Sequence, residues 1–250
     1  ASSPALAERP EDKVWLQGGV FRANADTFAR VDNPELGLPG TRIDFEGDLG
    51  LRDKQWLPKI AGGVRIGRKL RVEGDYFSLD RSGTTTLERL LGVDDTQFPV
   101  GATVDSQFST RIWRIALGWS PVLTEHGEFG VAVGVHLTDA KFSIEAEVPD
   151  DEGTISLSER RKATIPLPNI SLYGNYKFDK TWALHAKVDL LSLKVGDYKG
   201  QLVDAQLGVS ARLQKNIGVG LAYRYVDYDL EARRSDWSGK LEYRYNGPLA

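Results

Sequence analysis

The chain has 250 residues, a formal net charge of -3 at pH 7 and 41% hydrophobic residues. The slightly negative charge argues against a nucleic-acid-binding protein, and the absence of cysteine excludes disulfides and thiolate metal sites. No apolar run reaches the roughly 18 residues that a transmembrane helix needs, whereas membrane-spanning β-strands, which are apolar only at every second residue, stay compatible with this composition.

The first segment, residues 1–12, is small, polar and rich in proline and alanine. It resembles the start of a mature chain after removal of a signal peptide, although a trimmed chain would begin in the same way. We expect these residues to form a tail outside a single folded domain that spans residues 13–250.

Most of the remaining chain alternates apolar and polar residues with a period of two, which predicts β-strands. The sequence predicts about ten strands, with eight or twelve as alternatives. Their expected ranges are 13–23, 57–67, 69–80, 104–119, 128–144, 163–178, 182–194, 201–213, 217–230 and 239–250. Only "TTTLERLLG" (residues 84–92) is expected to form a helix, because Thr85 and Glu88 have the spacing of a capping box.

The connections between these strands alternate between short and long. "GRK" (67–69), "FDKT" (178–181) and "QKN" (214–216) are tight turns, whereas the connections expected at 24–56, 81–103, 145–162 and 231–238 are long and polar. This alternation is typical of an antiparallel up-and-down transmembrane β-barrel with short periplasmic turns and long extracellular loops.

The two faces of each strand indicate which side faces the interior. In "FGVAVGVHL", Phe129, Val131 and Val133 oppose glycine and alanine on the other face. With the apolar face inward the chain would be a soluble, lipocalin-like carrier; with it outward the barrel would stand in lipid around a polar lumen. Glycine in mid-strand weakens a solvent-facing surface but makes room in a narrow lumen, which favours the second interpretation.

Aromatic residues cluster near the strand ends on the apolar face, where two interfacial girdles of a membrane barrel would lie. The predicted girdle residues are Tyr76, Trp113, Trp119, Phe129, Phe178, Trp182, Tyr223 and Tyr225.

The phrases "GGVRIGRKLRVEGDYF", "GTRIDFEGDLGL" and "LEYRYNGPLA" resemble segments of small outer-membrane β-barrel proteins of Gram-negative bacteria. The resemblance covers nearly the whole chain and implies an outer-membrane location with lipid as the surroundings, but it implies no known activity. Such barrels usually end on an aromatic residue, so the end at Ala250 suggests a trimmed last strand.

The polar faces of the strands predict a charged lumen. Its candidate residues are Lys59, Arg65, Arg71, Glu73, Asp75, Arg114, His136, His185, Lys187, Asp189, Asp204, Arg212, Arg224, Glu242 and Arg244. Two interpretations remain open: a satisfied ion-pair network that fills the interior, or a narrow path for small polar or anionic solutes. His136 and His185 near Asp189 invite a catalytic interpretation, but no nucleophile or metal-ligand spacing accompanies them, and no catalytic residue is assigned.

Asp44, Glu46 and Asp48 alternate in "RIDFEGDLG" and are a weak candidate for a calcium site in a loop. We otherwise expect no metal, no cofactor and no nucleic-acid partner. The function favoured is a non-enzymatic envelope protein, monomeric or within an envelope complex, that acts as a narrow pore or as a structural, partner-binding barrel. The alternatives are an outer-membrane hydrolase acting on lipid or peptide at the rim and the soluble carrier.

Overall fold

The structure is a computed structural model that describes residues 10, 12–32, 41–93, 96–150, 153–195, 197–233 and 238–250. Its strands are β1 (Val14–Asp32), β2 (Ile43–Asp44), β3 (Lys54–Ile66), β4 (Leu70–Thr86), β5 (Leu91–Val93), β6 (Thr96–Phe98), β7 (Thr103–Leu123), β8 (Gly127–Asp150), β9 (Gly153–Lys177), β10 (Trp182–Val195), β11 (Tyr198–Gln214), β12 (Ile217–Arg233) and β13 (Ser238–Leu249).

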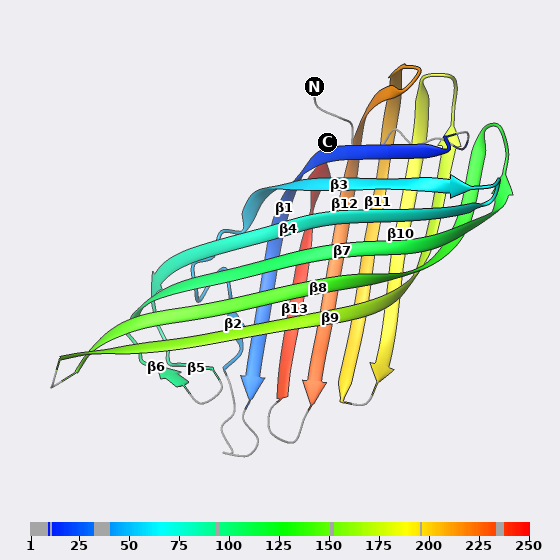
Figure 1. Cartoon of the computed structure of the whole chain (residues 1–250). Helices are drawn as coiled ribbons and strands as arrows, with labels where there is room; N and C mark the ends of the chain where they lie inside the picture. The colour runs from blue at the N-terminus through cyan, green and yellow to red at the C-terminus, as the bar shows by residue number, and fades with distance from the viewer. Residues whose placement is uncertain are drawn as a thin grey trace.

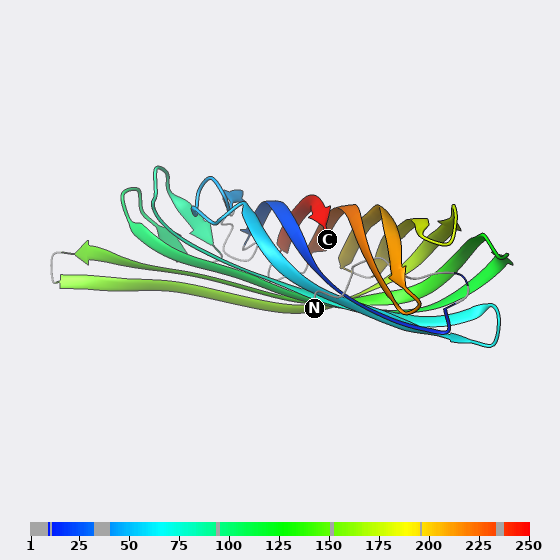
Figure 2. The same cartoon turned by 90° about the horizontal axis from the view of Figure 1, so that it is seen from above.

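Ten long strands form one antiparallel sheet that closes on itself, because β13 at the end of the strand order pairs back with β1. The short β2 adds to β1, and β5 and β6 form a separate two-stranded sheet. Figure 1 shows β3, β4, β7, β8 and β9 crossing β10 to β13 at a steep angle. Figure 2 shows the two groups as the walls of a flattened barrel. The predicted ten-stranded antiparallel barrel is confirmed.

The short turns at 67–69, 124–126, 178–181 and 215–216 all join strands at one end of the barrel, which we call the turn end. The opposite end is the loop end. β1 begins and β13 finishes near the turn end, where Val20 and Ala250 exchange two backbone hydrogen bonds. Residues 1–9 and 11 of the expected tail lie outside the described residues.

The expected long loops are largely strand in the structure. β8 and β9 pair without interruption as far as Asp150 and Gly153, so the range 145–162 is almost entirely a hairpin. β1 continues to Asp32, β4 continues to Thr86, β12 continues to Arg233 and β13 begins at Ser238. These extensions are polar on their outward face, so their composition resembled loop while their two-residue alternation continued.

The helix expected at residues 84–92 is wrong. Thr84, Thr85 and Thr86 continue β4 and pair with β7, with cross-strand hydroxyl contacts from Thr84 to Asp105 at 2.5 Å and between Thr86 and Thr103 at 3.2 Å. β-Branched threonines fit a pleated sheet better than a helix. The described part of the chain contains no helix long and apolar enough to span a membrane.

The interior changes character along the barrel axis. Charged and polar side chains fill the half nearer the turn end, and buried aromatic and aliphatic side chains fill the half nearer the loop end. The lumen is therefore filled by side chains in both halves, by charged groups in one and by apolar groups in the other.

Candidate functional site

The outer surface carries the apolar face of the strands. Val133 is 62% exposed, whereas its neighbours Ala132 and His136 on the other face are 3% and 0% exposed. Long apolar side chains such as Leu207 and Leu221 also point outward. The alternative of a soluble, lipocalin-like carrier is therefore wrong, because that fold would bury these residues.

The predicted girdle residues all lie on the outer face. They are Tyr76, Trp113, Trp119, Phe129, Phe178, Trp182, Tyr223 and Tyr225. The rings of Tyr76 and Trp113 lie 4.3 Å apart between their centroids. Towards the loop end the outward residues become charged, as in the ion pair between Asp227 and Arg244 at 3.1 Å. The apolar surface is therefore a belt of limited height, bounded by aromatic residues, as a bilayer requires.

The inner face carries every predicted lumen residue except Glu242 and Arg244. On β13 the odd-numbered residues from Tyr243 onward are buried, so Glu242 and Arg244 beside them point outward. The prediction placed charges inside because it treated this strand as immersed in lipid throughout. Its first half instead lies beyond the apolar belt, where outward charges meet water: Glu242 pairs with Lys240, and Arg244 pairs with Asp227.

At the turn end, Arg65 donates two hydrogen bonds of 2.9 Å to the buried carboxylate of Glu128, in the bidentate geometry that arginine favours. The same carboxylate accepts hydrogen bonds from Ser120 and, at 3.3 Å, from Asn175. Arg71 stacks on the ring of Tyr173, 3.9 Å from its centroid. This cluster crosses the lumen from β3 to β9.

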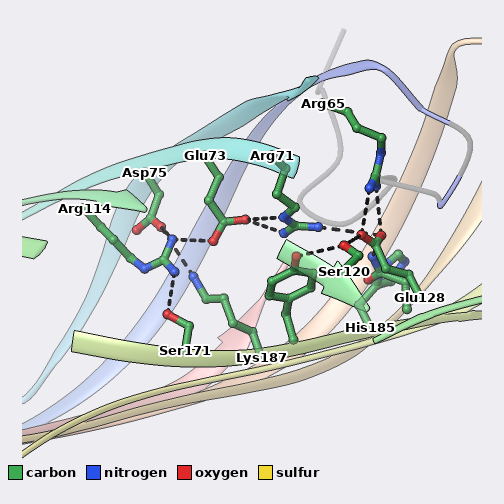
Figure 3. A network of polar contacts seen from close by, with 12 residues as sticks. Arg65, Arg71, Glu73, Asp75, Arg114, Ser120, Glu128, Ser171, His185 and Lys187 are labelled. Atoms are coloured by element: carbon green, nitrogen blue, oxygen red, sulfur yellow. Dashed lines mark hydrogen bonds and ion pairs between the residues drawn. The ribbon is translucent and has the colours of Figure 1, made fainter. Parts of the chain in front are cut away.

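Arg114 is the centre of a second cluster. Its side chain is 1% exposed and donates to Asp189 at 2.6 Å. Figure 3 shows two further acceptors, Glu73 at 2.6 Å and Ser171 at 3.0 Å. Glu73 also accepts a hydrogen bond from Arg71 at 3.0 Å, which joins the two clusters. Lys187 lies 3.5 Å from Asp75 and 3.9 Å from Asp189. Charges taken out of water are tolerated only when they are paired in this way.

Contacts of four further residues, Arg224, His185, Lys59 and Arg212, complete the polar half of the lumen. Arg224 donates to both oxygens of Asp204 at 3.0 and 2.5 Å. His185 bonds Asn175 at 2.9 Å and Ser210 at 2.7 Å, and Lys59 donates to Gln206 at 3.1 Å. Arg212 lies nearer the turn end, partly exposed, and pairs with Asp12 at 2.5 Å. A cavity of about 70 Å³ beside Lys59, Asp75 and Trp15 leaves room for a few water molecules.

Both lumen histidines are held in buried polar contacts. His136 bonds Asp189 at 3.1 Å and lies beside Asp204, with ligand atoms of the three residues within 4.8 Å of one another. That grouping could suggest a metal site, but Arg114 and Arg224 already occupy the two carboxylates. A divalent cation would have to approach two guanidinium groups, so the residues fit an ion-pair network better than a metal centre.

Above the polar half, aromatic side chains close the lumen. Phe21, Phe77 and Tyr245 are each at most 1% exposed, and the ring of Tyr245 lies 5.9 Å from that of Phe21 and 5.6 Å from that of Phe77. Arg224 lies beneath this layer, 4.6 Å from the centroid of Phe77. We call the seven aromatic residues of this region the aromatic plug. They are Phe21, Phe77 and Tyr245, with Phe45, Phe108, Tyr228 and Tyr243 above them. Sequence reasoning missed the plug because it assumed a polar lumen along the whole barrel.

The acidic turn after β2 contributes Phe45 to the aromatic plug. Phe45 from this turn lies 5.1 Å from the rings of Phe108 and Phe142. Glu46 pairs with Arg81 and accepts a hydrogen bond from the Thr27 amide at 2.8 Å. Burial raises the pKa of Glu46 above its usual range, an effect that Arg81 opposes.

The weak calcium candidate belongs to the same turn. One oxygen of Asp44 accepts the amides of Glu46 and Gly47. Asp48 accepts the amide of Asp44 at 2.8 Å and pairs with Arg89. In the described part of the chain these carboxylates serve backbone amides and arginines, and they do not converge on one point.

An apolar belt, aromatic borders and a charged interior define a transmembrane β-barrel of the Gram-negative outer-membrane class. No protein-family model and no curated protein sequence matches the chain. Among solved structures it is similar to the outer membrane protease OmpT from Escherichia coli, with 10% identity, 98% of each chain covered and a TM-score of 0.59. It is more distantly similar to the Pseudomonas putida toluene transporter TodX, with 8% identity, coverage of 96% of this chain and 89% of that chain, and a TM-score of 0.34. The likeness to OmpT extends over the whole barrel and concerns the fold.

Proposed function

We propose that the protein is a non-enzymatic barrel of the bacterial outer membrane that conducts no solute and that serves as a structural, partner-binding platform. The belt of exposed apolar side chains, bounded by the girdle residues, supports the location because it matches a bilayer rather than water.

The observation that carries this proposal is the closure of the lumen at two levels. The cluster around Arg114 crosses the lumen near the middle of the barrel, and the aromatic plug fills the lumen beyond it. A solute would have to break buried ion pairs and displace packed rings, both of which are costly. This arrangement favours the ion-pair interpretation of the charged lumen over the solute path.

The structure gives the hydrolase alternative no comparable support. OmpT is a protease, but this chain is 10% identical to it and that likeness concerns the fold alone. His136 is fully buried and bonded to Asp189, and His185 is bonded on both ring nitrogens. Neither ring is accessible to a lipid or peptide at the rim.

Planar-bilayer recording with the purified full chain tests the proposal. We expect silent bilayers at a protein loading where a known porin gives many channels. A variant that removes part of both barriers, Arg114→Ser with Phe77→Ala and Tyr245→Ala, should conduct, and Trp113→Ala on the outer face should stay silent as the matched control. Regular unitary steps from the unaltered chain would overturn the proposal.

A further inference from the structure

The seam between β9 and β10 is paired along only part of its length. Pairing extends from Lys177 opposite Ala183 to Ile170 opposite Leu190 and then stops. β9 continues to Gly153, paired with β8 on its other side throughout. β10 continues to Val195, paired only with β11. Figure 1 shows the two strands diverging towards the loop end. In the part of the chain that the structure describes, no strand forms a ladder with this edge of β9 from residue 169 to residue 153. β6 approaches the segment on its inner face, where Thr96 donates a hydrogen bond to Glu159 at 2.8 Å.

The hydrogen-bonding direction of each β9 residue follows from two contacts at the turn end. The amide of Lys177 donates to His126 on the β8 side at 2.7 Å, and the amide of Phe178 donates to Trp182 on the β10 side at 3.0 Å. Direction alternates along an antiparallel strand, and the β8–β9 register has no shift. Even-numbered residues of β9 therefore direct their amides towards the unpaired edge.

Two prolines explain why the seam stops. If the β9–β10 register continued, Pro168 would lie opposite Ser192 and Pro166 opposite Lys194. Both prolines are even-numbered, so each lacks the N–H group that the ladder would use at that point. On the inner side, Leu167, Leu191 and Leu230 lie around Gly200 and close the interior behind the split.

Beyond the prolines the edge offers a continuous row of donors. All six residues that present N–H groups to it are exposed: Thr154, Ser156, Ser158, Arg160, Lys162 and Thr164. Natural sheets normally shorten or cover such an edge, because it is a template for another strand. Here no described residue between 153 and 165 on this edge is a proline or belongs to a bulge. The protection that the edge does have is the positive charge of Arg160 and Lys162, which an acidic partner would neutralise.

We propose that the β9 edge at residues 153–165 is a strand-addition site for an extended peptide segment with acidic and apolar residues in alternation. This inference rests on the proposed partner-binding function and names the kind of partner. Main-chain hydrogen bonds to the even-numbered residues give affinity, and the side chains of the two faces give specificity.

The charge and polarity of the two faces define that partner. Arg160 and Lys162 stand on the outer face of the edge, and the segment 153–165 contains a single acidic residue, Glu159. Arg160 pairs with Glu145 of β8 at 2.5 Å, but this pair is exposed to solvent and contributes little, so Arg160 can also face an acidic residue of a partner. Acidic side chains directly opposite the two basic residues would be stabilising cross-strand neighbours. The inner face offers Ile155, which is 48% exposed, and the half-buried Leu157, so the partner residues opposite them should be apolar. The two charged residues of this face, Glu159 and Arg161, pair with each other at 3.0 Å.

A second copy of this chain does not fit the edge. Two copies in one membrane would be related by an axis along the membrane normal, so both β9 strands would run towards the same side. With strand tilts of about 35–45° the two edges would cross at roughly 70–90°, whereas paired strands differ by only about 20–25°. The guest strand therefore comes from a different molecule.

Fluorescence anisotropy with the full chain in lipid nanodiscs tests the proposal. The probes are labelled peptides of about 12 residues: alternating valine and glutamate, alternating valine and lysine, and the valine–glutamate peptide N-methylated at every second residue. We expect the first to bind at least about tenfold more tightly than the other two. Equal binding of all three, or binding of none, would overturn the proposal.

Variants of the chain locate the binding on the β9 edge. Arg160→Glu with Lys162→Glu should reverse the preference between the two charged peptides. Arg68→Glu with Lys180→Glu, the same charge change at the turn end, should leave it unaltered. Ser158→Pro removes one edge donor and should weaken binding by about tenfold or more, whereas Ser158→Ala should not.

Hydrogen exchange supplies a measurement that does not depend on variants. Bound valine–glutamate peptide should slow exchange at the six edge amides and leave the amides of odd-numbered β9 residues unchanged. Slower exchange at other amides, with no change at these six, would refute the assignment of the site to the β9 edge. A silent bilayer without peptide binding would refute the strand-addition site and agree with the non-conducting barrel. Conductance together with peptide binding would refute the non-conducting barrel and agree with the strand-addition site.

Discussion

Replacing both seam prolines, Pro166→Val with Pro168→Val, should extend the β9–β10 ladder towards the loop end. The continued register brings Ser192 opposite residue 168 and Lys194 opposite residue 166. Each valine restores one N–H group directed at β10, and valine suits a strand. The leucines around Gly200 already lie together on the inner side, so closing the seam requires little repacking.

The expected gain follows from the restored hydrogen bonds. A protein hydrogen bond contributes about 0.5–1.5 kcal/mol net, so two restored donors should raise the free energy of unfolding by about 1–3 kcal/mol. Because each 1.4 kcal/mol corresponds to a factor of about ten, amide exchange at Ser192 and Lys194 should slow by about 5- to 150-fold.

Hydrogen exchange resolved at single amides and urea unfolding from lipid vesicles measure the two quantities. Each single substitution should give about half the gain in stability, since each restores one donor. If the double variant exchanged at Ser192 and Lys194 as fast as the unaltered chain, the prolines would not be the cause of the split seam.

Three further predictions concern the lumen, the outward-facing charges of β13 and the acidic turn after β2. Arg114→Ala should lower the free energy of unfolding by about 3–5 kcal/mol in urea titrations, because it leaves the buried carboxylates of Glu73 and Asp189 without their arginine; a loss below about 1 kcal/mol, the scale of an exposed pair, would contradict a central role. Arg244→Leu should change stability by less than about 1 kcal/mol because its pair with Asp227 is exposed, whereas Arg224→Leu should cost several times more; equal losses would place both side chains inside the lumen. The raised pKa of Glu46 means that the folded state holds this proton more tightly than the unfolded chain does, so its stabilising contribution is complete below the unfolded pKa and is lost as pH rises through the folded pKa. Glu46→Gln should therefore flatten the loss of stability as pH rises from about 4, near the unfolded pKa of glutamate, towards neutrality, and an unchanged pH profile in the same unfolding assay would count against the assignment.

The sequence predicted the architecture because a membrane barrel encodes it locally. The face of each strand could be assigned from neighbouring residues alone, as with Val133 outside and His136 inside. The same reasoning failed at Glu242 and Arg244, since the meaning of a charge depends on whether that part of the strand stands in lipid or in water. A sequence pattern does not mark the height at which the bilayer ends.

The pairing partners inside the lumen lay beyond sequence reasoning. Arg114 and Asp189 are 75 residues apart and meet because of the stagger between successive strands, which each strand pair contributes in small steps. The aromatic plug depends on the same stagger, since it brings Phe77 of β4 next to Tyr245 of β13. The split seam, by contrast, was readable in principle from "IPLP", because two prolines on one edge of a strand interrupt pairing on that side only.

The contact of Tyr245 with Phe21 joins the last strand of the chain to the first. This pair of rings comes together only when the first and last strands meet, so closure of the barrel also completes the aromatic plug. An assembly intermediate that still lacks the final strand would have an open side and would lack the two rings, Tyr243 and Tyr245, that this strand adds to the aromatic plug. The closed barrel therefore never exists without the complete aromatic plug.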